Sequence, residues 1–153
     1  MKNNTDLERR GGNLILTGWG WKEYAVAAAV ALRALGTNAD IKGMSKRRLP
    51  EFLEDHGSDY RAIYIIGISL AGDVERLVKA LAALRKNDVK LFWISSIPLD
   101  AAQATALAPF MNVHVKAAKD GLFNGALVKA AGEYFKEDFS DVLPFAKEGS
   151  SIP

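Results

Sequence analysis

The chain has 153 residues, of which 49% are hydrophobic and 25% are charged, as in an ordinary soluble globular domain. Its 20 basic and 18 acidic residues leave a net charge of +2, which does not favour nucleic acid or a membrane surface as the partner of this domain. The absence of cysteine excludes disulfides, thiolate metal sites and cysteine nucleophiles, and two histidines are too few for a histidine-rich metal site.

The hydrophobic pattern predicts short buried strands that alternate with helices along the whole chain. The expected strands are residues 14–17, 38–45, 62–69, 89–95 and 112–118. The expected helices are residues 22–35, 46–57, 98–110 and 121–137, together with one that opens at Gly72-Asp73 and continues through Leu84. Gly36 is expected to end the first helix, Pro50 to lie in the first turn of the second, and Asp73 to complement the positive end of the third.

This alternation predicts one α/β domain over residues 13–139, because parallel strands need helical crossover connections. We expect three layers, α/β/α, around a five-stranded, mostly parallel sheet in the order 2-1-3-4-5. Residues 1–12 are expected to be a flexible N-terminus without the apolar core of a signal peptide. Residues 140–153 gain proline, glycine and serine, which is typical of a linker to a further domain and equally of an ordinary chain end.

The longest apolar run is interrupted by Arg33 and is too short to cross a bilayer. Together with the lack of cysteine, this leads us to expect a cytoplasmic protein that does not enter the membrane.

A ligand site in such a fold is expected beyond the carboxyl ends of the strands. The residues there offer backbone amides, hydroxyl groups and a lysine, which together are typical of an anion-binding crevice. The same small residues also suit tight turns that bind nothing, and both interpretations remain open. The candidate ligand-binding residues are Thr17, Gly18, Trp19, Gly20, Trp21, Lys22, Ser69, Ser95 and Ser96.

Known motifs of this fold class are incomplete. The stretch "GWGWKE" lacks the third glycine of the dinucleotide fingerprint and the glycine-lysine-serine or -threonine of a phosphate loop. Gly67-Ile68-Ser69-Leu70-Ala71 has alanine in place of the second glycine of a serine nucleophile elbow, and neither histidine follows in the order that a triad requires.

Other polar and aromatic residues have two interpretations each. Trp19 and Trp21 could stack on a ligand, or cover a core edge or a protein interface. The cluster Lys46-Arg47-Arg48 at a helix start is unfavourable for the helix dipole, so it meets either an acidic or phosphate partner or only solvent. His56 and His114 are expected to be structural.

The strand and loop pattern resembles the N-terminal domain of the DHH-family phosphoesterases, mainly over residues 13–96. The first motif of that family is a strand followed by Thr-His-x-Asp-x-Asp-Gly and an alanine-rich helix. Here the strand, Thr17 and the helix "YAVAAAVALRALG" match, but the histidine, the two aspartates and the glycine are replaced by Gly18, Gly20, Lys22 and Glu23.

The other two motifs also keep the scaffold and lack the ligands. "IYIIGIS" has Gly67 at the family's aspartate, and "KLFWI" leads into Ser95-Ser96-Ile97 instead of Asp-His-His. Two-metal phosphoryl chemistry needs those carboxylates, so the resemblance implies a domain with no catalytic residue, metal ligand or cofactor. Glycine and serine at these positions would leave space and amide donors for a phosphorylated ligand.

We therefore expect a non-catalytic DHH-like regulatory or sensor domain that binds a phosphorylated small molecule, a protein partner or a second copy of itself. A place in a larger bacterial regulatory protein, such as a transcription activator with an ATPase, would suit the predicted tail. The alternative is a metal-dependent phosphoesterase or nucleotide-handling enzyme whose ligands lie elsewhere in the chain. A receiver-like interaction module is a third class, against which the lack of an acidic cluster at the strand ends argues.

Overall fold

Five strands form one parallel sheet in the order β2-β1-β3-β4-β5, in a computed structural model that describes residues 11–18, 22–36, 39–69, 74–116 and 125–147. Every neighbouring pair is parallel. The predicted fold class and strand order are confirmed. The strands are β1 Gly11–Thr17, β2 Ala39–Gly43, β3 Tyr60–Ile66, β4 Lys90–Ser95 and β5 Asn112–Val115.

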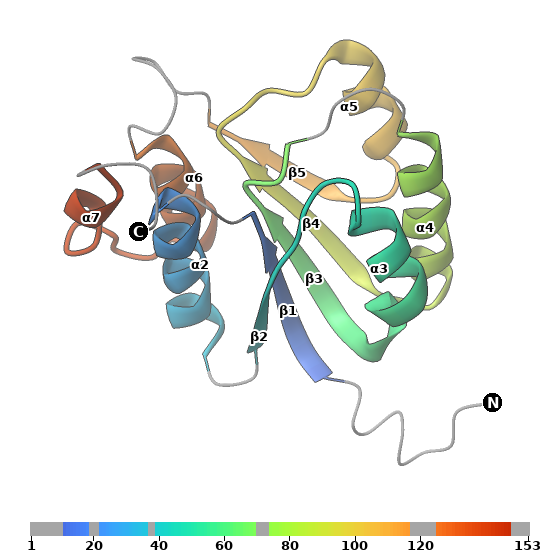
Figure 1. Ribbon diagram of the computed structural model, residues 1–153, viewed down its shortest axis with the longest axis horizontal. Coiled ribbons are helices and arrows are strands. Elements are labelled where there is room, and N and C mark those ends of the chain that lie inside the picture. The colour runs from blue at the N-terminus through green and yellow to red at the C-terminus, as the bar shows by residue number, and fades with distance from the viewer. Residues whose placement is uncertain (1–10, 19–21, 37–38, 70–73, 117–124, 148–153) are drawn as a thin grey trace.

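Helices cover both faces of the sheet and complete a Rossmann-like α/β/α arrangement (Figure 1). One face lies under α2, α6 and α7, and the other lies under α3, α4 and α5. The helices are α2 Lys22–Leu35, α3 Leu49–His56, α4 Glu75–Lys86, α5 Ala101–Leu107, α6 Ala126–Phe135 and α7 Leu143–Lys147, with a 3-10 turn at Gly57–Asp59.

Two hydrophobic cores result, because successive residues of a strand point to opposite faces. In β1, Leu14 and Leu16 belong to the core under α3–α5, whereas Ile15 belongs to the core under α2 and α6. All three side chains are buried. Covering both faces explains why the central strands read as unbroken apolar runs in the sequence.

The helix ends follow the predicted chemistry where the structure describes them. Gly36 ends α2 with a left-handed φ of +79°, and its amide donates to the Leu32 carbonyl over 2.8 Å. Pro50 lies in the first turn of α3, where its missing amide hydrogen costs nothing. Asp100 and Gln103 form a reciprocal capping box at the start of α5. Asp73, the predicted cap of the third helix, lies outside the described residues.

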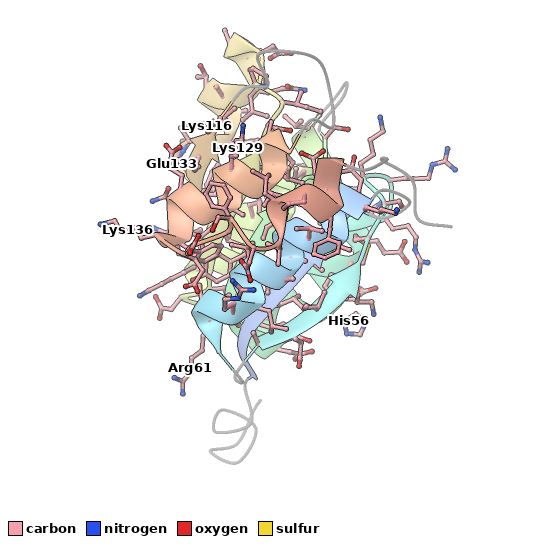
Figure 2. The ribbon with its side chains drawn as sticks, turned by 90° about the vertical axis from the view of Figure 1, so that its left-hand side faces the viewer. His56, Arg61, Lys116, Lys129, Glu133 and Lys136 are labelled. Atoms are coloured by element: carbon pink, nitrogen blue, oxygen red, sulfur yellow. The ribbon has the colours of Figure 1, made fainter. Side chains whose placement is uncertain are left out.

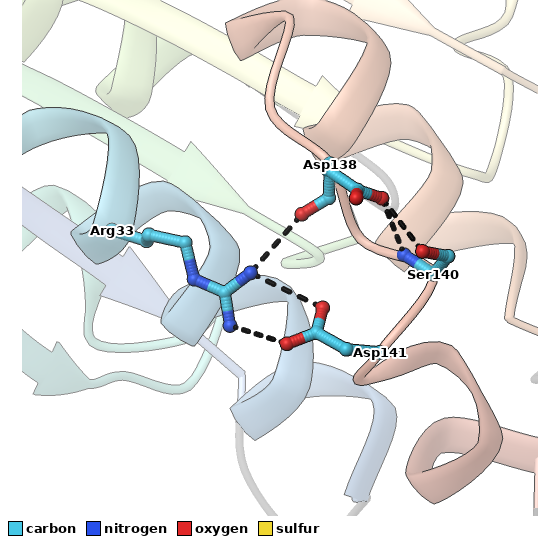
Figure 3. A network of polar contacts seen from close by, with 4 residues as sticks. All are labelled: Arg33, Asp138, Ser140 and Asp141. Carbon is cyan, nitrogen blue, oxygen red and sulfur yellow. Dashed lines mark hydrogen bonds and ion pairs between the residues drawn. The ribbon is translucent and has the colours of Figure 1, made fainter.

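Part of the predicted linker-like tail is packed against the domain. Leu143–Lys147 forms α7 against α2, and Ala146 is 1% exposed in the core under α2 and α6. The Arg33 guanidinium donates to both carboxylate oxygens of Asp141, over 3.2 and 3.1 Å, and to the Asp138 carbonyl over 3.1 Å (Figure 3). A five-residue helix is too short to display a hydrophobic period, so the composition pointed to a linker.

Candidate functional site

The predicted site residues that the structure describes follow the carboxyl ends of β1, β3 and β4. These are Thr17, Gly18, Lys22, Ser69, Ser95 and Ser96. Trp19, Gly20 and Trp21 lie outside the described residues. We call this side of the sheet the carboxyl edge; it also contains Gly43 to Ser45 after β2 and Lys116 after β5.

The two buried hydroxyl groups of the predicted site lie on opposite faces of the sheet. Thr17 lies two residues after Ile15 in β1 and therefore points to the same face of the sheet, under α2 and α6. Ser95 lies two residues after Trp93 in β4 and points to the opposite face, under α3, α4 and α5. Ser95 is 2% exposed, and its Oγ both accepts from the Ile97 amide over 3.0 Å and donates to the Ile97 carbonyl over 3.2 Å. The structure therefore does not bring these two hydroxyl groups into one site.

Glycine at the ends of β1 and β3 does not leave space, contrary to what the resemblance implied, because Tyr24 fills it. A Cβ added at Gly18 would lie 2.9 Å from Cε2 of Tyr24. One added at Gly67, whose φ is +76°, would lie 2.6 Å from Cδ2 of Leu127 and 3.1 Å from Cδ1 of Tyr24. Burial beneath the helices raises the pKa of the Tyr24 phenol, and the neighbouring Glu23 raises it further. At both positions glycine permits close packing of an aromatic ring.

Glu23 occupies the place expected for a bound anion. Its side chain is 1% exposed, and Oε1 accepts a hydrogen bond of 2.8 Å from the backbone amide of Leu127. Leu127 lies in the first turn of α6, where free amides and the helix dipole attract negative charge. Burial raises the pKa of Glu23, and the bond from Leu127 partly offsets this. The protein thus supplies its own carboxylate to this helix end.

Sequence reasoning gave Glu23 no such role, since an acid in the first turn of α2 suits that helix by itself. The contact joins positions 104 residues apart, and nothing in the local sequence signals it.

Thr17 carries a buried hydroxyl group at the predicted site. It is 6% exposed at the end of β1, and its Oγ1 has no hydrogen-bond partner in the described part of the chain. Its backbone carbonyl accepts from the Met44 amide over 2.8 Å, which brings the end of β2 next to the end of β1.

Met44 also lines a cavity of about 480 Å³, which lies between the end of β2 and α3. Its walls carry both cationic and acidic side chains around the ring of Phe52. The lining residues are Ile41, Lys42, Gly43, Met44, Ser45, Arg48, Glu51, Phe52, Asp55 and His56. Of the basic cluster noted in the sequence, Arg48 lines the cavity and all three residues are exposed. The sequence signal for this site is a stripe along α3 with helical spacing.

Each histidine lies near one carboxylate, and the His114 Nε2 atom is buried without a hydrogen-bond partner in the described part of the chain. His56 Nδ1 lies 3.9 Å from Asp59 Oδ2. His114 Nε2 lies 3.8 Å from Glu133 Oε1, and its ring meets Tyr134 edge-on at 5.6 Å between centroids. Figure 2 shows Lys116 beside Glu133, with which it makes a 2.7 Å ion pair that lowers the pKa of Glu133. His56 lies on a different side of the molecule (Figure 2).

Within the described residues there is no group of three or more histidine, aspartate or glutamate side chains that could hold a metal ion. None of the helices in the same part of the chain is both long and apolar enough to cross a membrane.

No family model matches the chain, and a comparison with curated proteins finds no match either.

Proposed function

We propose that this chain is a non-catalytic regulatory domain that acts by binding, on a scaffold that resembles the DHH phosphoesterases. The observation that carries the proposal is the state of Glu23. It is the carboxylate nearest to the family's first metal motif, and it is buried and hydrogen-bonded to the start of α6. A carboxylate held in this way serves packing, whereas a metal-binding carboxylate must direct its oxygens into an open site.

The neighbouring positions support the same proposal. Gly18 and Gly67, which align with a histidine and an aspartate of the family motifs, lie under Tyr24 and Leu127. A ligand-binding side chain at either position would collide with these groups. Tyr24 and Leu127 thus fill the space at the positions that align with metal ligands in the DHH phosphoesterases, which supports a non-catalytic function.

The test is a hydrolysis assay of the purified chain with Mn²⁺ or Mg²⁺ and pyrophosphate, a short oligonucleotide or a cyclic dinucleotide. We expect no turnover above that of the metal ion alone. The matched variant is Glu23→Gln, which keeps an oxygen acceptor for the Leu127 amide and removes the negative charge.

Metal-dependent turnover that disappears in Glu23→Gln, while the variant keeps its circular dichroism spectrum, would contradict the proposal. That result would favour the alternative of a metal-dependent phosphoesterase. Turnover that persists unchanged in the variant would also contradict it, and would place the metal ligands elsewhere in the chain.

A further inference from the structure

The cavity between β2 and α3 has an ordered distribution of charge. Its helical wall is formed by the stripe Arg48, Glu51, Phe52, Asp55 and His56, at spacings of three and four residues. With a rise of about 1.5 Å per residue, Arg48 lies roughly 4.5 Å along the helix axis from Glu51 and roughly 10 Å from Asp55. Positive charge therefore stands at the carboxyl edge, and negative charge stands further along α3.

The strand wall extends the positive end. Lys42 projects from β2, with its Nζ 5.0 Å from the centre of the Phe52 ring. Ser45 adds a hydroxyl group, whose oxygen accepts from the Arg48 amide over 3.3 Å. The Phe52 ring also contacts His56, with the ring centroids 5.3 Å apart. The cavity therefore has an aromatic wall as well as charged ones.

Within the described residues, the positive and negative side chains of the cavity do not pair with one another. Among the described residues, the side chains of Lys42 and Arg48 make no ion pair with Glu51 or Asp55, although all four line the same space. The charges of Glu51 and Asp55 contribute to raising the pKa of Arg76, but the guanidinium of Arg76 makes its ion pair with Glu54, over 2.7 Å. Arg48 is the N-cap residue of α3, where a positive charge is unfavourable for the helix dipole, and its side chain makes no capping hydrogen bond to the described part of the helix.

We propose that this cavity binds a small zwitterion, with a carboxylate or phosphate at Lys42 and Arg48 and an ammonium group at Glu51 and Asp55. The inference rests on the proposed binding function and names its ligand class. A ligand of this kind pairs with both sets of charges at once. A simple anion would be repelled by the two acids, and a simple cation by Lys42 and Arg48.

The size of the cavity fits the same class, since pockets for small molecules typically measure about 300–1,000 Å³. It opens at the end of β2, on the side of the sheet where ligands of parallel α/β domains bind. The sequence pointed to this edge, but to the ends of β1, β3 and β4 instead of the end of β2.

The experiment is an NMR titration of the whole chain, following backbone amides, with glycine, 4-aminobutanoate and 6-aminohexanoate. Butanoate and butylamine serve as probes that carry one charge each. We expect the two longer amino acids to bind roughly fivefold or more tightly than glycine or either singly charged probe. The shifted amides should belong to residues 41–45 and 48–56.

Two exposed cavity residues provide the matched variants. Arg48→Gln should weaken binding of the longer amino acids at least about threefold without weakening that of butylamine. Asp55→Asn should weaken binding of the amino acids to a similar degree without weakening that of butanoate. Arg47→Gln, which changes the neighbouring exposed cation outside the cavity lining, is the control and should leave all affinities unchanged.

Three results would overturn the inference: butanoate binding as tightly as the amino acids, shifts confined to amides outside the cavity, or no shift at millimolar concentration. None of them bears on catalysis, so each leaves the proposed function standing. Metal-dependent hydrolysis, in contrast, would remove the proposed function without any change in the titration.

Discussion

At Glu23 one buried carboxylate joins two helices, and its protonation should be visible in the stability of the protein. Burial raises the pKa of Glu23 in the folded chain above its ordinary value of 4.5. A raised pKa means that the contribution of this group to stability is complete below the unfolded pKa and is lost as the pH rises through the folded pKa. Glu23→Gln has no charge to bury and keeps the bond from Leu127.

The free energy of unfolding of Glu23→Gln, relative to the original chain, should therefore increase between about pH 3.5 and pH 7. Urea unfolding at both pH values measures this difference. Glu133→Gln is a control of opposite sign, because Lys116 lowers the pKa of Glu133 and the charged form is the stabilising one. Parallel pH dependence of the two variants would contradict the assignment of Glu23 as a buried, desolvated acid.

Gly67 and Gly36 form a second matched pair at this scale. Both have a left-handed φ, +76° and +79°, but an added Cβ meets Leu127 and Tyr24 at Gly67 and nothing within 4 Å at Gly36. Gly36→Ala should cost about 1 kcal/mol of stability from backbone strain alone. Gly67→Ala should cost roughly 2–4 kcal/mol, because overpacking adds to the strain.

Chemical denaturation of the two glycine variants distinguishes these contributions. Equal losses of stability would show that Tyr24 and Leu127 yield easily to a methyl group. The packing of Tyr24 and Leu127 over the ends of β1 and β3 could then also accommodate a metal-binding side chain.

At the scale of elements, Arg33 connects α2 to the segment that leads into α7. The guanidinium reaches Asp138 and Asp141 from α2 (Figure 3), and the segment between them is held further by a bond from the Ser140 amide to the Asp138 carboxylate over 2.9 Å. Arg33→Ala should therefore increase amide hydrogen exchange in residues 139–146 and leave the sheet unchanged.

Arg76→Ala is the control for the Arg33 variant, because Arg76 makes an equally exposed ion pair with Glu54 on the opposite face of the sheet. Its exchange in residues 139–146 should match that of the original chain. If Arg33→Ala also leaves this exchange unchanged, apolar contacts such as those of Ala146 hold α7 by themselves.

The elements that the sequence predicts well are those whose local signals agree. The bounds of α2, Lys22 to Leu35, follow from an alanine-rich period ended by Gly36. The ends of β3 are less accurate: Ser69 was placed in the strand, but the strand ends at Ile66 because the positive φ of Gly67 breaks it. The helix α7 was missed altogether, since its packing on α2 is a tertiary contact.

At the scale of the whole molecule, strand order was predictable and the candidate site was not. The strand order follows from the alternation of strands and helices along the chain and from the right-handed crossover that connects parallel strands. The alternation can be read from the local sequence. The site depends on where Tyr24, Glu23 and Leu127 meet, and on how the stripe from Arg48 to His56 faces β2. These are pairings between distant segments, and the local pattern of a single sequence contains no record of them.

The bond between Glu23 and Leu127 marks a layer of the fold whose helices come from distant parts of the chain. Helices α3, α4 and α5 follow one another in sequence, whereas the opposite layer combines α2 with α6 and α7, which are synthesised after all five strands. Until α6 has emerged as a whole, Ile15, Ile66 and Ile94 lack its cover. A growing chain therefore presents an apolar strip on one side of a nearly complete sheet, the kind of surface that chaperones bind.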